Sequence, residues 1–364
     1  MSHIVLVIAS LNPGGAEHVL SNLANYWVSQ GYDVSLITFS AVNYAPFYYL
    51  DSRVNLIQLG QSSSAASLFS QKWRLLKRLF LLRKTIKKNR PDVIISFIDM
   101  MNVIVLAVTR RLKIPVIVSE RIDPTHHPVS MFRQWLRLKL YPLAACLVVQ
   151  TERVARYFPK HFKQFIKIIP NSVVMPDIQR DEAFKDIRHI VSVGRLAYQK
   201  GYDTLIHALS TIIKFYPDII LTIYGEGPER KNLECLIESL DLKNHVYLPG
   251  TTKDIQMVLR RADLFIFPSR YEGFPNALCE AMAMGLPVIA SDCSGNVDVV
   301  RDGIDGKLFP VNDIALLANI TLELLRNPYE CTRLAYHAKE VCDRFHPDCI
   351  FSLWDDVISN VIKR

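Results

Sequence analysis

Hydrophobic positions along the 364-residue chain follow two alternating patterns. Short continuous apolar runs, such as residues 4–8 and 264–267, are typical of strands buried on both faces of a sheet. Between them, apolar residues recur three or four positions apart, as in residues 19–28, which predicts helices packed on the sheet. Strands are predicted at residues 3–9, 33–39, 93–97, 116–119, 147–150, 189–193, 219–224, 264–267 and 288–290. This alternation predicts an α/β protein with parallel sheets.

The chain is long enough for two domains, and half of its residues are apolar. Residues 175–188 form a polar stretch that we interpret as a linker into the second domain. Residues 40–70 are Ser-rich and irregular, and we expect no regular element there. Helices are expected at residues 71–90, 276–284 and 351–363.

Charge is unevenly distributed along the sequence. Residues 1–170 carry 22 Lys and Arg against 8 Asp and Glu, whereas residues 171–364 carry 21 against 27. This asymmetry indicates that the first half meets an anionic partner, which leaves nucleic acid, a membrane or a phosphorylated acceptor open. No nucleic-acid-reading module is recognisable, and the acidic second half argues against a continuous basic track.

The basic residues concentrate in the predicted helix of residues 71–90, which has nine Lys and Arg and no acidic residue. Its apolar residues have helical spacing, so one face can pack on the sheet while the basic groups cover the rest. Such a helix indicates contact with a membrane surface or a polyphosphate, although a solvated face is the common alternative. The candidate contacts are Arg74, Lys77, Arg78, Lys84 and Lys88.

Residues 132–141 form a second candidate for interfacial binding. Arg133, Arg137 and Lys139 alternate there with Trp135 and leucines, a mixture that suits a headgroup interface. A short packed helix is the alternative.

Cysteine usage and the chain start bear on the compartment. Seven cysteines without a C-x-x-C motif indicate reduced thiols in a cytoplasmic protein. The first strand has no basic lead-in that would indicate a signal peptide, and no apolar run of about 18 residues is present. We therefore expect a protein that is soluble or bound to a membrane surface.

Candidate chemistry lies in the strand-loop-helix-strand stretch of residues 263–291. The loop after such a strand and the helix N-terminus that follows it form a usual ligand site in open α/β sheets. Glu272 lies in this loop, and Glu280 lies within an apolar helix. A partly buried carboxylate needs hydrogen-bond donors, and sugar or ribose hydroxyls can supply them.

A second pair of candidates follows the strand of residues 189–193. Arg195 and Lys200 are five positions apart, and both can reach a diphosphate. A further turn, Gly14-Gly15, lies between the first strand and helix, where it can approach a phosphate closely or serve the fold alone. Its spacing does not match the G-x-G-x-x-G fingerprint of dinucleotide sites.

These motifs together resemble family 4 of the retaining glycosyltransferases, which have the GT-B fold. Residues 272–281 are similar to the family's E-x7-E motif, and residues 14–17, 168–173, 194–201 and 225–228 resemble its other loops. The resemblance implies two Rossmann-like domains whose parallel sheets face a central cleft. Residues 1–174 and a returning final helix at 350–364 would form the first, and residues 175–349 the second.

The resemblance also implies roles for individual residues. Glu272 would lie beside the donor sugar, while Arg195 and Lys200 would stabilise the leaving diphosphate, so these three are the expected catalytic residues. Glu280 would hold the nucleotide ribose. The expected donor site is completed by Gly14, Gly15, Gly194, Gly225, Thr252, Gly273, Phe274, Pro275 and Asn276.

One position departs from the family pattern. Many members place a histidine after the strand of residues 116–119, where this chain has Arg121. Arg121 is therefore a candidate substitute for this histidine and a candidate acceptor contact, and His126 is the second candidate substitute.

The acceptor is suggested by a likeness to bacterial transferases that extend polyprenyl-diphosphate-linked glycans, including N-glycan GalNAc transferases. The likeness rests on residues 21–25, on residues 96–99 and on the basic helix. It implies transfer from a UDP-sugar to a lipid-linked glycan on the inner face of the cytoplasmic membrane. Lipopolysaccharide core and capsular repeat units remain open as acceptors.

The sequence contains no D-x-D motif, so a nucleotide-bound metal is not implied and no cofactor is expected. Two rival classes stay open at this point. A nucleotide-sugar epimerase of the same fold would share the two-domain architecture but would have little use for the basic helix. A non-enzymatic protein that binds anionic surfaces would use the basic first half.

Overall fold

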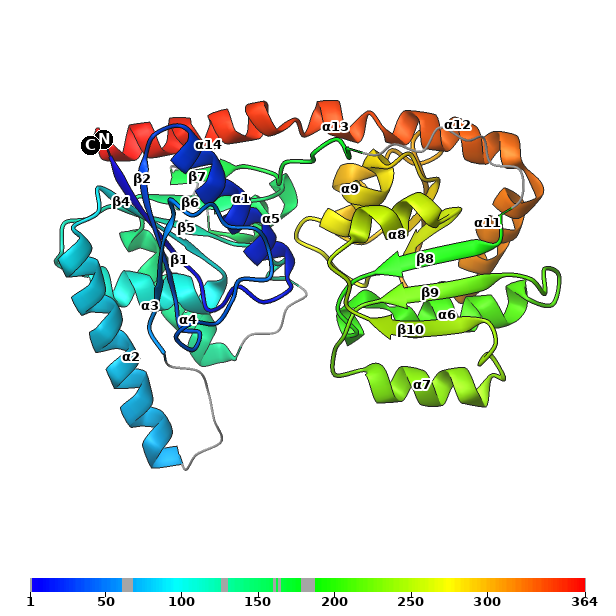
Figure 1. The fold of residues 1–364 in the computed structure, drawn as a ribbon, viewed down its shortest axis with the longest axis horizontal. Helices are drawn as coiled ribbons and strands as arrows, with labels where there is room; N and C mark the ends of the chain where they lie inside the picture. Colours follow the sequence, from blue (N-terminus) through cyan, green and yellow to red (C-terminus); the bar gives the residue numbers. More distant parts are fainter. Residues whose placement is uncertain are drawn as a thin grey trace. The chain divides into compact units, whose positions relative to one another are not determined.

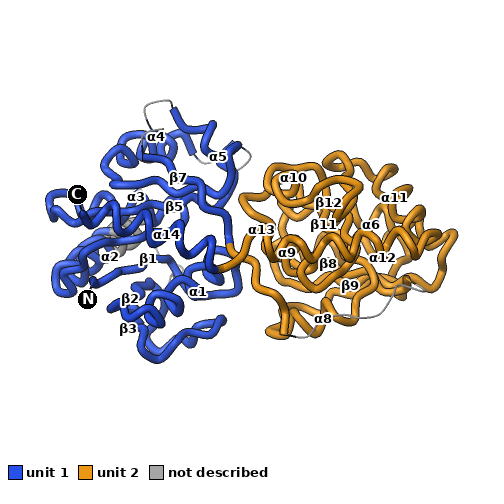
Figure 2. Tube along the Cα trace, turned by 90° about the horizontal axis from the view of Figure 1, so that it is seen from above, with its two compact units in different colours: residues 1–171, 348–364 blue, residues 172–347 orange. Residues whose placement is uncertain are grey.

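The computed structural model describes residues 2–60, 68–125, 130–159, 162, 165–177 and 187–363, with the side chains of α2 described from Leu76 onward. The chain divides into two compact units (Figure 2). Unit 1 comprises residues 1–171 and 348–364, and unit 2 comprises residues 172–347.

The described part of unit 1 contains a seven-stranded parallel sheet in the order β3-β2-β1-β4-β5-β6-β7. Its strands are β1 (His3–Val7), β2 (Asp33–Thr38), β3 (Asn55–Gln58), β4 (Val93–Phe97), β5 (Val116–Ser119), β6 (Cys146–Val149) and β7 (Ile166–Ile168). The central strands are buried on both faces, which explains their continuous apolar sequences.

Helices cover both faces of this sheet (Figure 1). They are α1 (Gly15–Ser29), α2 (Leu68–Asn89), α3 (Asp99–Thr109), α4 (Met131–Leu140), the 3-10 turn η1 (Tyr141–Leu143), α5 (Glu152–Tyr157) and α14 (Pro347–Ile362). Helices α1 and α14 pack on the face that carries Ile4 and Leu6. Helices α2, α3 and α5 pack on the opposite face, which carries Val5 and Val7.

The last helix of the chain completes the core of unit 1. Trp354 of α14 is 1% exposed and packs edge-on against Trp27 of α1, with ring centroids 6.2 Å apart. Asp355 accepts hydrogen bonds from Tyr26 Oη at 2.6 Å and from Trp27 Nε1 at 2.9 Å. One face of unit 1 is therefore built from the two ends of the sequence.

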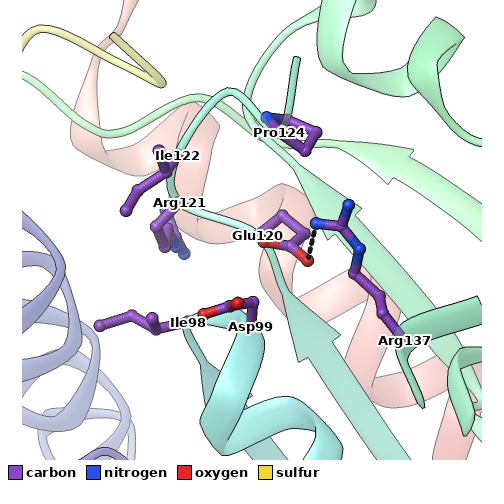
Figure 3. Close-up of a pocket in the computed structure, with 7 residues that line it drawn as sticks. All are labelled: Ile98, Asp99, Glu120, Arg121, Ile122, Pro124 and Arg137. Carbon is purple, nitrogen blue, oxygen red and sulfur yellow. Dashed lines mark ion pairs between the residues drawn. The ribbon is translucent and has the colours of Figure 1, made fainter. Parts of the chain in front are cut away.

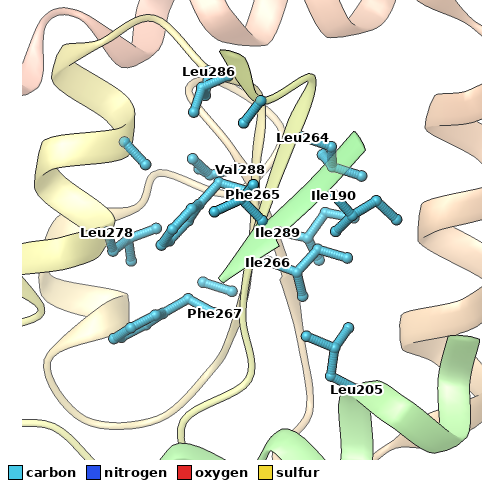
Figure 4. Close-up of a cluster of buried hydrophobic side chains, with 14 of the residues drawn as sticks. Ile190, Leu205, Leu264, Phe265, Ile266, Phe267, Leu278, Leu286, Val288 and Ile289 are labelled. Atoms are coloured by element: carbon cyan, nitrogen blue, oxygen red, sulfur yellow. The ribbon is translucent and has the colours of Figure 1, made fainter. Parts of the chain in front are cut away.

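The described part of unit 2 contains a six-stranded parallel sheet in the order β10-β9-β8-β11-β12-β13. Its strands are β8 (His189–Val193), β9 (Ile220–Tyr224), β10 (Val246–Gly250), β11 (Leu264–Phe267), β12 (Val288–Ser291) and β13 (Lys307–Phe309). Figure 4 shows side chains leaving β11 in alternate directions, with Phe267 toward Leu278 of α9 (Asn276–Ala283) and Ile266 toward Leu205 of α6 (Tyr202–Ile212).

The helices of unit 2 cover this sheet and close one hydrophobic core with it. They are η3 (Tyr198–Lys200, 3-10), α6 (Tyr202–Ile212), α7 (Arg230–Ser239), α8 (Ile255–Arg261), α9 (Asn276–Ala283), α10 (Asn296–Val299), α11 (Ile314–Arg326), α12 (Pro328–Ala338) and α13 (Val341–Arg344). Two parallel sheets with helical layers confirm the predicted α/β class.

The structure contains short strands that the sequence did not predict. The stretch of residues 40–70 is not wholly irregular, because β3 pairs in parallel with β2 there. Strands β7, β10 and β13 were likewise not predicted. Within the described ranges, no helix is long and apolar enough to cross a membrane.

Candidate active site

Strand order brings the predicted catalytic loops together at one edge of the unit 2 sheet. Strand β8 lies between β9 and β11, so the loops that leave these parallel strands are neighbours. Gly201 allows a close approach between two of these loops. Its φ is +64°, and a Cβ there would lie 2.1 Å from the carbonyl oxygen of Pro268, which follows β11. A side chain at this position would push the Lys200 loop away from the Glu272 loop.

Lys200 and Glu272 form an ion pair, with 2.6 Å between Nζ and Oε1. Both side chains are largely buried, and Nζ also lies 4.6 Å from the centre of the Phe267 ring. Gln199 Nε2 donates to the Tyr271 carbonyl at 2.8 Å and lies 3.4 Å from Glu272 Oε2. The structure thus brings two of the three predicted catalytic residues into contact.

The backbone of Glu272 is also fixed. Its N–H donates to the Ser294 carbonyl at 3.1 Å, and a Cβ on Gly295 would lie 2.9 Å from the Glu272 Cβ. Glu272 is therefore held by its main chain and by a salt bridge. Sequence reasoning did not find Gln199 or the Ser294-Gly295 turn, because neither carries a charge or belongs to a recognised motif.

The glycine loops after β8 and β9 fit against each other. A Cβ on Gly225 would lie 1.9 Å from the Gly194 carbonyl oxygen. The two loops are therefore packed too closely to admit a side chain at Gly225. The Gly225 N–H donates to the Gly250 carbonyl at 2.9 Å, which ties in the loop containing Thr252. Three predicted donor-site segments are thereby joined through backbone contacts.

Arg195 follows Gly194 directly and has an exposed side chain. Within the described part of the chain, its guanidinium makes no hydrogen bond or ion pair. Lys200, in contrast, is paired with Glu272. Among the described residues, Arg195 is thus a cation without an ion pair, whereas Lys200 is partly neutralised.

Helix α9 begins beside this ion pair. Gly273, Phe274 and Pro275 are buried, and the Phe274 ring packs edge-on against Phe345 at 5.2 Å. Pro275 occupies the N-cap position and has no side-chain acceptor, so the first N–H groups of the helix, from Asn276 on, are not capped by it. The helix N-terminus carries partial positive charge, which suits an anionic ligand.

Glu280 lies one turn further along α9 and is half-buried. Burial raises the pKa of its carboxyl group to about 7, because the carboxylate loses hydration. Near neutral pH the side chain can therefore hold or release its proton, depending on the donors that a ligand brings.

Three of the predicted site residues in unit 1 lie outside helix α2. Gly14 is the N-cap of α1 and Gly15 is its first residue, and the Gly14 N–H donates to Tyr48 Oη at 3.2 Å. His18 in the first turn of α1 stacks on Tyr48 at 4.6 Å, and burial lowers its pKa.

Arg121, the third, follows β5 and is only 8% exposed. Its guanidinium lies 3.9 Å above the Phe97 ring, and Nη1 donates to Asn171 Oδ1 at 2.7 Å. Nε and Nη2 have no hydrogen-bond partner among the described residues. Burial lowers the Arg121 pKa to about 9. The sequence identified Arg121 but not Asn171, which was read only as part of a turn.

A small pocket lies beside Arg121 (Figure 3). Figure 3 shows the Glu120 and Arg137 side chains pointing toward one another at its wall, with 3.6 Å between Oε1 and Nη1. Tyr141 Oη also donates to Glu120. Burial raises the pKa of Glu120 to about 7, although Arg137 and Tyr141 act in the opposite direction.

This arrangement corrects the prediction for Arg137. We expected it to belong to the interfacial surface of residues 132–141, but it is 3% exposed and paired with Glu120. The helical pattern did not reveal this, because Glu120 lies in a loop distant in sequence.

The basic helix α2 presents Lys77, Lys84 and Lys88 to solvent, and none of them is in an ion pair with a described residue. Arg78 is half-buried and lies 5.9 Å from the Phe39 ring, so it is less available than predicted. The Arg74 side chain and His126 lie outside the described residues. No group of His, Cys, Asp and Glu that could hold a metal ion occurs within the described ranges.

Comparison with known proteins places the whole chain among the glycosyltransferases. Residues 13–175 match the model described as Glycosyltransferase Family 4, and residues 175–341 match that of Glycosyl transferases group 1. Among solved structures, sucrose-phosphate synthase from Thermosynechococcus elongatus is similar over all of both chains, with a TM-score of 0.86 and 18% identity. That likeness shows the fold, which is the predicted GT-B fold.

Two curated relatives are similar in sequence. The GalNAc-α-(1→4)-GalNAc-α-(1→3)-diNAcBac-PP-undecaprenol α-1,4-N-acetyl-D-galactosaminyltransferase of Campylobacter jejuni is 30% identical over 99% of each chain. The UDP-Gal:α-D-GlcNAc-diphosphoundecaprenol α-1,3-galactosyltransferase of Escherichia coli is 27% identical over 67% of this chain and 69% of its own. The chain therefore belongs to the family 4 glycosyltransferases.

Proposed function

We propose that this glycosyltransferase moves a sugar from a UDP-sugar to a polyprenyl-diphosphate-linked glycan, with retention of the anomeric configuration and without a metal ion. The observation that carries the proposal is the convergence of Lys200, Glu272 and the α9 N-terminus at one edge of the unit 2 sheet. The two curated relatives named above act, by their names, on undecaprenyl-diphosphate-linked acceptors, which supports the acceptor class.

Departure of the nucleoside diphosphate requires positive charge at the leaving oxygen. The exposed Arg195 and the nearby Lys200 would supply it, and the α9 N-terminus would add its partial charge. Each preorganised donor of this kind contributes about 3–4 kcal/mol to transition-state stabilisation. These cations would take the role that a metal has in other transferases.

Glu272 would orient the donor sugar by accepting hydrogen bonds from its hydroxyls. In the structure one carboxylate oxygen faces Lys200 and the other faces Gln199. Diphosphate binding would draw Lys200 toward the phosphates and leave Glu272 oxygens for the sugar. The departing phosphate oxygen would then accept the proton of the attacking hydroxyl, so no covalent enzyme nucleophile is invoked.

The acceptor would reach the enzyme at a membrane surface. Lys77, Lys84 and Lys88 of α2 face solvent and can contact an anionic headgroup or the lipid diphosphate. Two buried nitrogens of Arg121, Nε and Nη2, have no hydrogen-bond partner among the described residues and can donate to the acceptor. We propose that the protein works in the cytoplasm, peripherally bound to the inner face of the membrane.

The test is a transfer assay with a synthetic polyprenyl-diphosphate sugar and a panel of UDP-sugars, with and without EDTA. Lys200→Met and Glu272→Gln should each lower turnover by about 100-fold or more, since each removes a group at the reacting centre. Lys243→Met is the matched control, because Lys243 pairs with Glu238 on an exposed surface. Its turnover should equal that of the wild type.

The product and the metal dependence are read in the same assay. Proton NMR coupling constants of the product should show the donor's anomeric configuration, and EDTA should leave the rate unchanged. Near-normal turnover in either site variant, with correct folding, would remove the site assignment. An inverted product or complete loss of activity in EDTA would refute the corresponding part of the proposal.

A further inference from the structure

Helix α4 has its apolar side chains on the outside. Met131, Phe132, Trp135 and Leu138 are 90%, 67%, 54% and 38% exposed, and their spacing places them on one face of the helix. Arg137, on the opposite face, is 3% exposed. A helix on the surface of a globular protein normally shows the reverse distribution. We call these four exposed residues the α4 apolar face.

The orientation of α4 is fixed by its polar inner face. Arg137 pairs with Glu120 and donates to Tyr157 Oη at 2.9 Å, while Gln134 Nε2 donates to the same oxygen at 2.8 Å. Leu136 packs against the core of unit 1. The helix cannot roll to hide its apolar face without breaking a buried ion pair, so the exposure is built into the fold.

The exposed charged residues of α4 itself are basic. Arg133 and Lys139 of α4 are exposed, and so are Arg153 and Arg156 of α5, which contacts α4 through Tyr157. Glu152 is the exposed acidic residue of α5. A second copy of the chain docked on this face would bring like charges together. An anionic surface would instead be attracted to it.

Aromatic side chains beside basic ones are typical of the boundary between lipid headgroups and acyl chains. The Phe132 and Trp135 rings are stacked at 6.1 Å, so they form a single apolar projection. We propose that the α4 apolar face inserts into the headgroup boundary of an anionic bilayer. The inference deepens the proposed function, on which it rests, because a lipid-linked acceptor lies in such a surface.

Vesicle co-sedimentation of the purified protein tests this without nucleotide sugar or acceptor. The wild type should bind vesicles of phosphatidylcholine with phosphatidylglycerol and bind pure phosphatidylcholine more weakly. The Phe132→Ser/Trp135→Ser variant should lower the partition coefficient by about tenfold or more. Phe215→Ser is the matched control, since Phe215 is 60% exposed in unit 2, and it should bind like the wild type. Arg133→Gln and Lys139→Gln should each weaken binding about fivefold.

Insertion is read separately by fluorescence. Trp27 and Trp354 are buried, so in a Trp73→Phe background Trp135 is the tryptophan that can meet lipid. Brominated phosphatidylcholine in the anionic vesicles should quench this variant, and the quenching should vanish in Trp73→Phe/Trp135→Phe. Quenching that persists in the double variant, or unchanged binding of Phe132→Ser/Trp135→Ser, would overturn the inference.

Other occupants of the face give different results. If the face covered a second copy, the wild type would be a dimer by light scattering and Trp135→Ser a monomer, with no vesicle effect. If it bound nucleic acid, RNA would compete with vesicles of either lipid composition. Both results overturn the inference. Vesicle binding with no sugar transfer to any acceptor would defeat the proposed function and leave this inference standing.

Discussion

At the residue scale, the site depends on pairings that the sequence does not display. The sequence predicts Lys200 and Glu272 separately, each from its position after a strand, but their 2.6 Å contact follows from strand order. Gln199 was not predicted, because an uncharged amide beside the two cations has no sequence feature that marks it as a site residue. Arg121 was predicted as a contact, whereas its stacking on Phe97 and its bond to Asn171 required the fold.

Glu280 gives a pH-dependent prediction at this scale. Its pKa is raised to about 7 by burial, and ribose hydroxyls would donate to the ionised form. Affinity for UDP should therefore increase as pH rises through 7, with about a tenfold gain between pH 6 and pH 8. Glu280→Gln should bind UDP more weakly at pH 8 and show only the pH dependence of UDP itself. Calorimetric titration at the two pH values measures this, and parallel pH profiles for both proteins would contradict it.

At the element scale, the strands that the sequence missed are edge strands. β3 and β7 lie at the two edges of the unit 1 sheet, and β10 and β13 lie at the two edges of the unit 2 sheet. These strands have three to five residues, few of them buried. Interior strands are covered on both faces and read as apolar runs, whereas short edge strands need no such pattern. Hydrophobic periodicity therefore predicts the middle of each sheet better than its borders.

Helix α4, whose apolar face is exposed, shows that hydrophobic periodicity can also assign the wrong face of a helix to the core. Its mixture of aromatic and basic residues was recognised, but periodicity alone assigns the apolar stripe to the core. The buried Arg137 reverses that assignment, because its ion pair with Glu120 fixes which face is inside. Only the fold brings residues from α4 and the loop after β5 together.

The contact between the two glycine loops gives an element-scale prediction. Gly225→Ala would place a methyl group 1.9 Å from the Gly194 carbonyl oxygen, so both loops must move. We expect a loss of about 1–3 kcal/mol in the free energy of unfolding and at least a tenfold loss of UDP affinity. Denaturant unfolding and calorimetry measure the two effects.

Gly303→Ala is the control for that experiment. Gly303 has φ of +70° and no heavy atom within 4 Å of an added Cβ, so this variant isolates the backbone cost, about 1 kcal/mol. UDP affinity should be unchanged in it. Equal losses of affinity in the two glycine variants would show that the contact between the loops does not shape the donor site.

At the scale of the whole molecule, the two units are assembled from the sequence in different ways: unit 1 from two segments and unit 2 from one. Unit 2 is built from one continuous segment with a single core, whereas unit 1 needs residues 348–364 to cover one face of its sheet. The basic residues of α2 and the α4 apolar face also belong to unit 1. We therefore propose that unit 1 meets the membrane and the acceptor, while unit 2 carries most of the predicted donor site.

Trp354→Ala tests whether the hydrophobic cores of the two units are independent of each other. Trp354 is 1% exposed, contacts Trp27 and Phe97, and belongs to the core cluster beneath α1. Truncation should lower the free energy of unfolding of unit 1 by about 3–5 kcal/mol. Hydrogen exchange followed by mass spectrometry should show faster exchange in β1, β4 and α1 and unchanged exchange in β8 and β11, which belong to a separate cluster.

Tyr336→Ala, at a 74% exposed aromatic residue of unit 2, is the control and should change the free energy of unfolding of neither unit by more than about 0.5 kcal/mol. If β8 and β11 lost protection together with β1, the two units would unfold as one, and the cores would depend on each other.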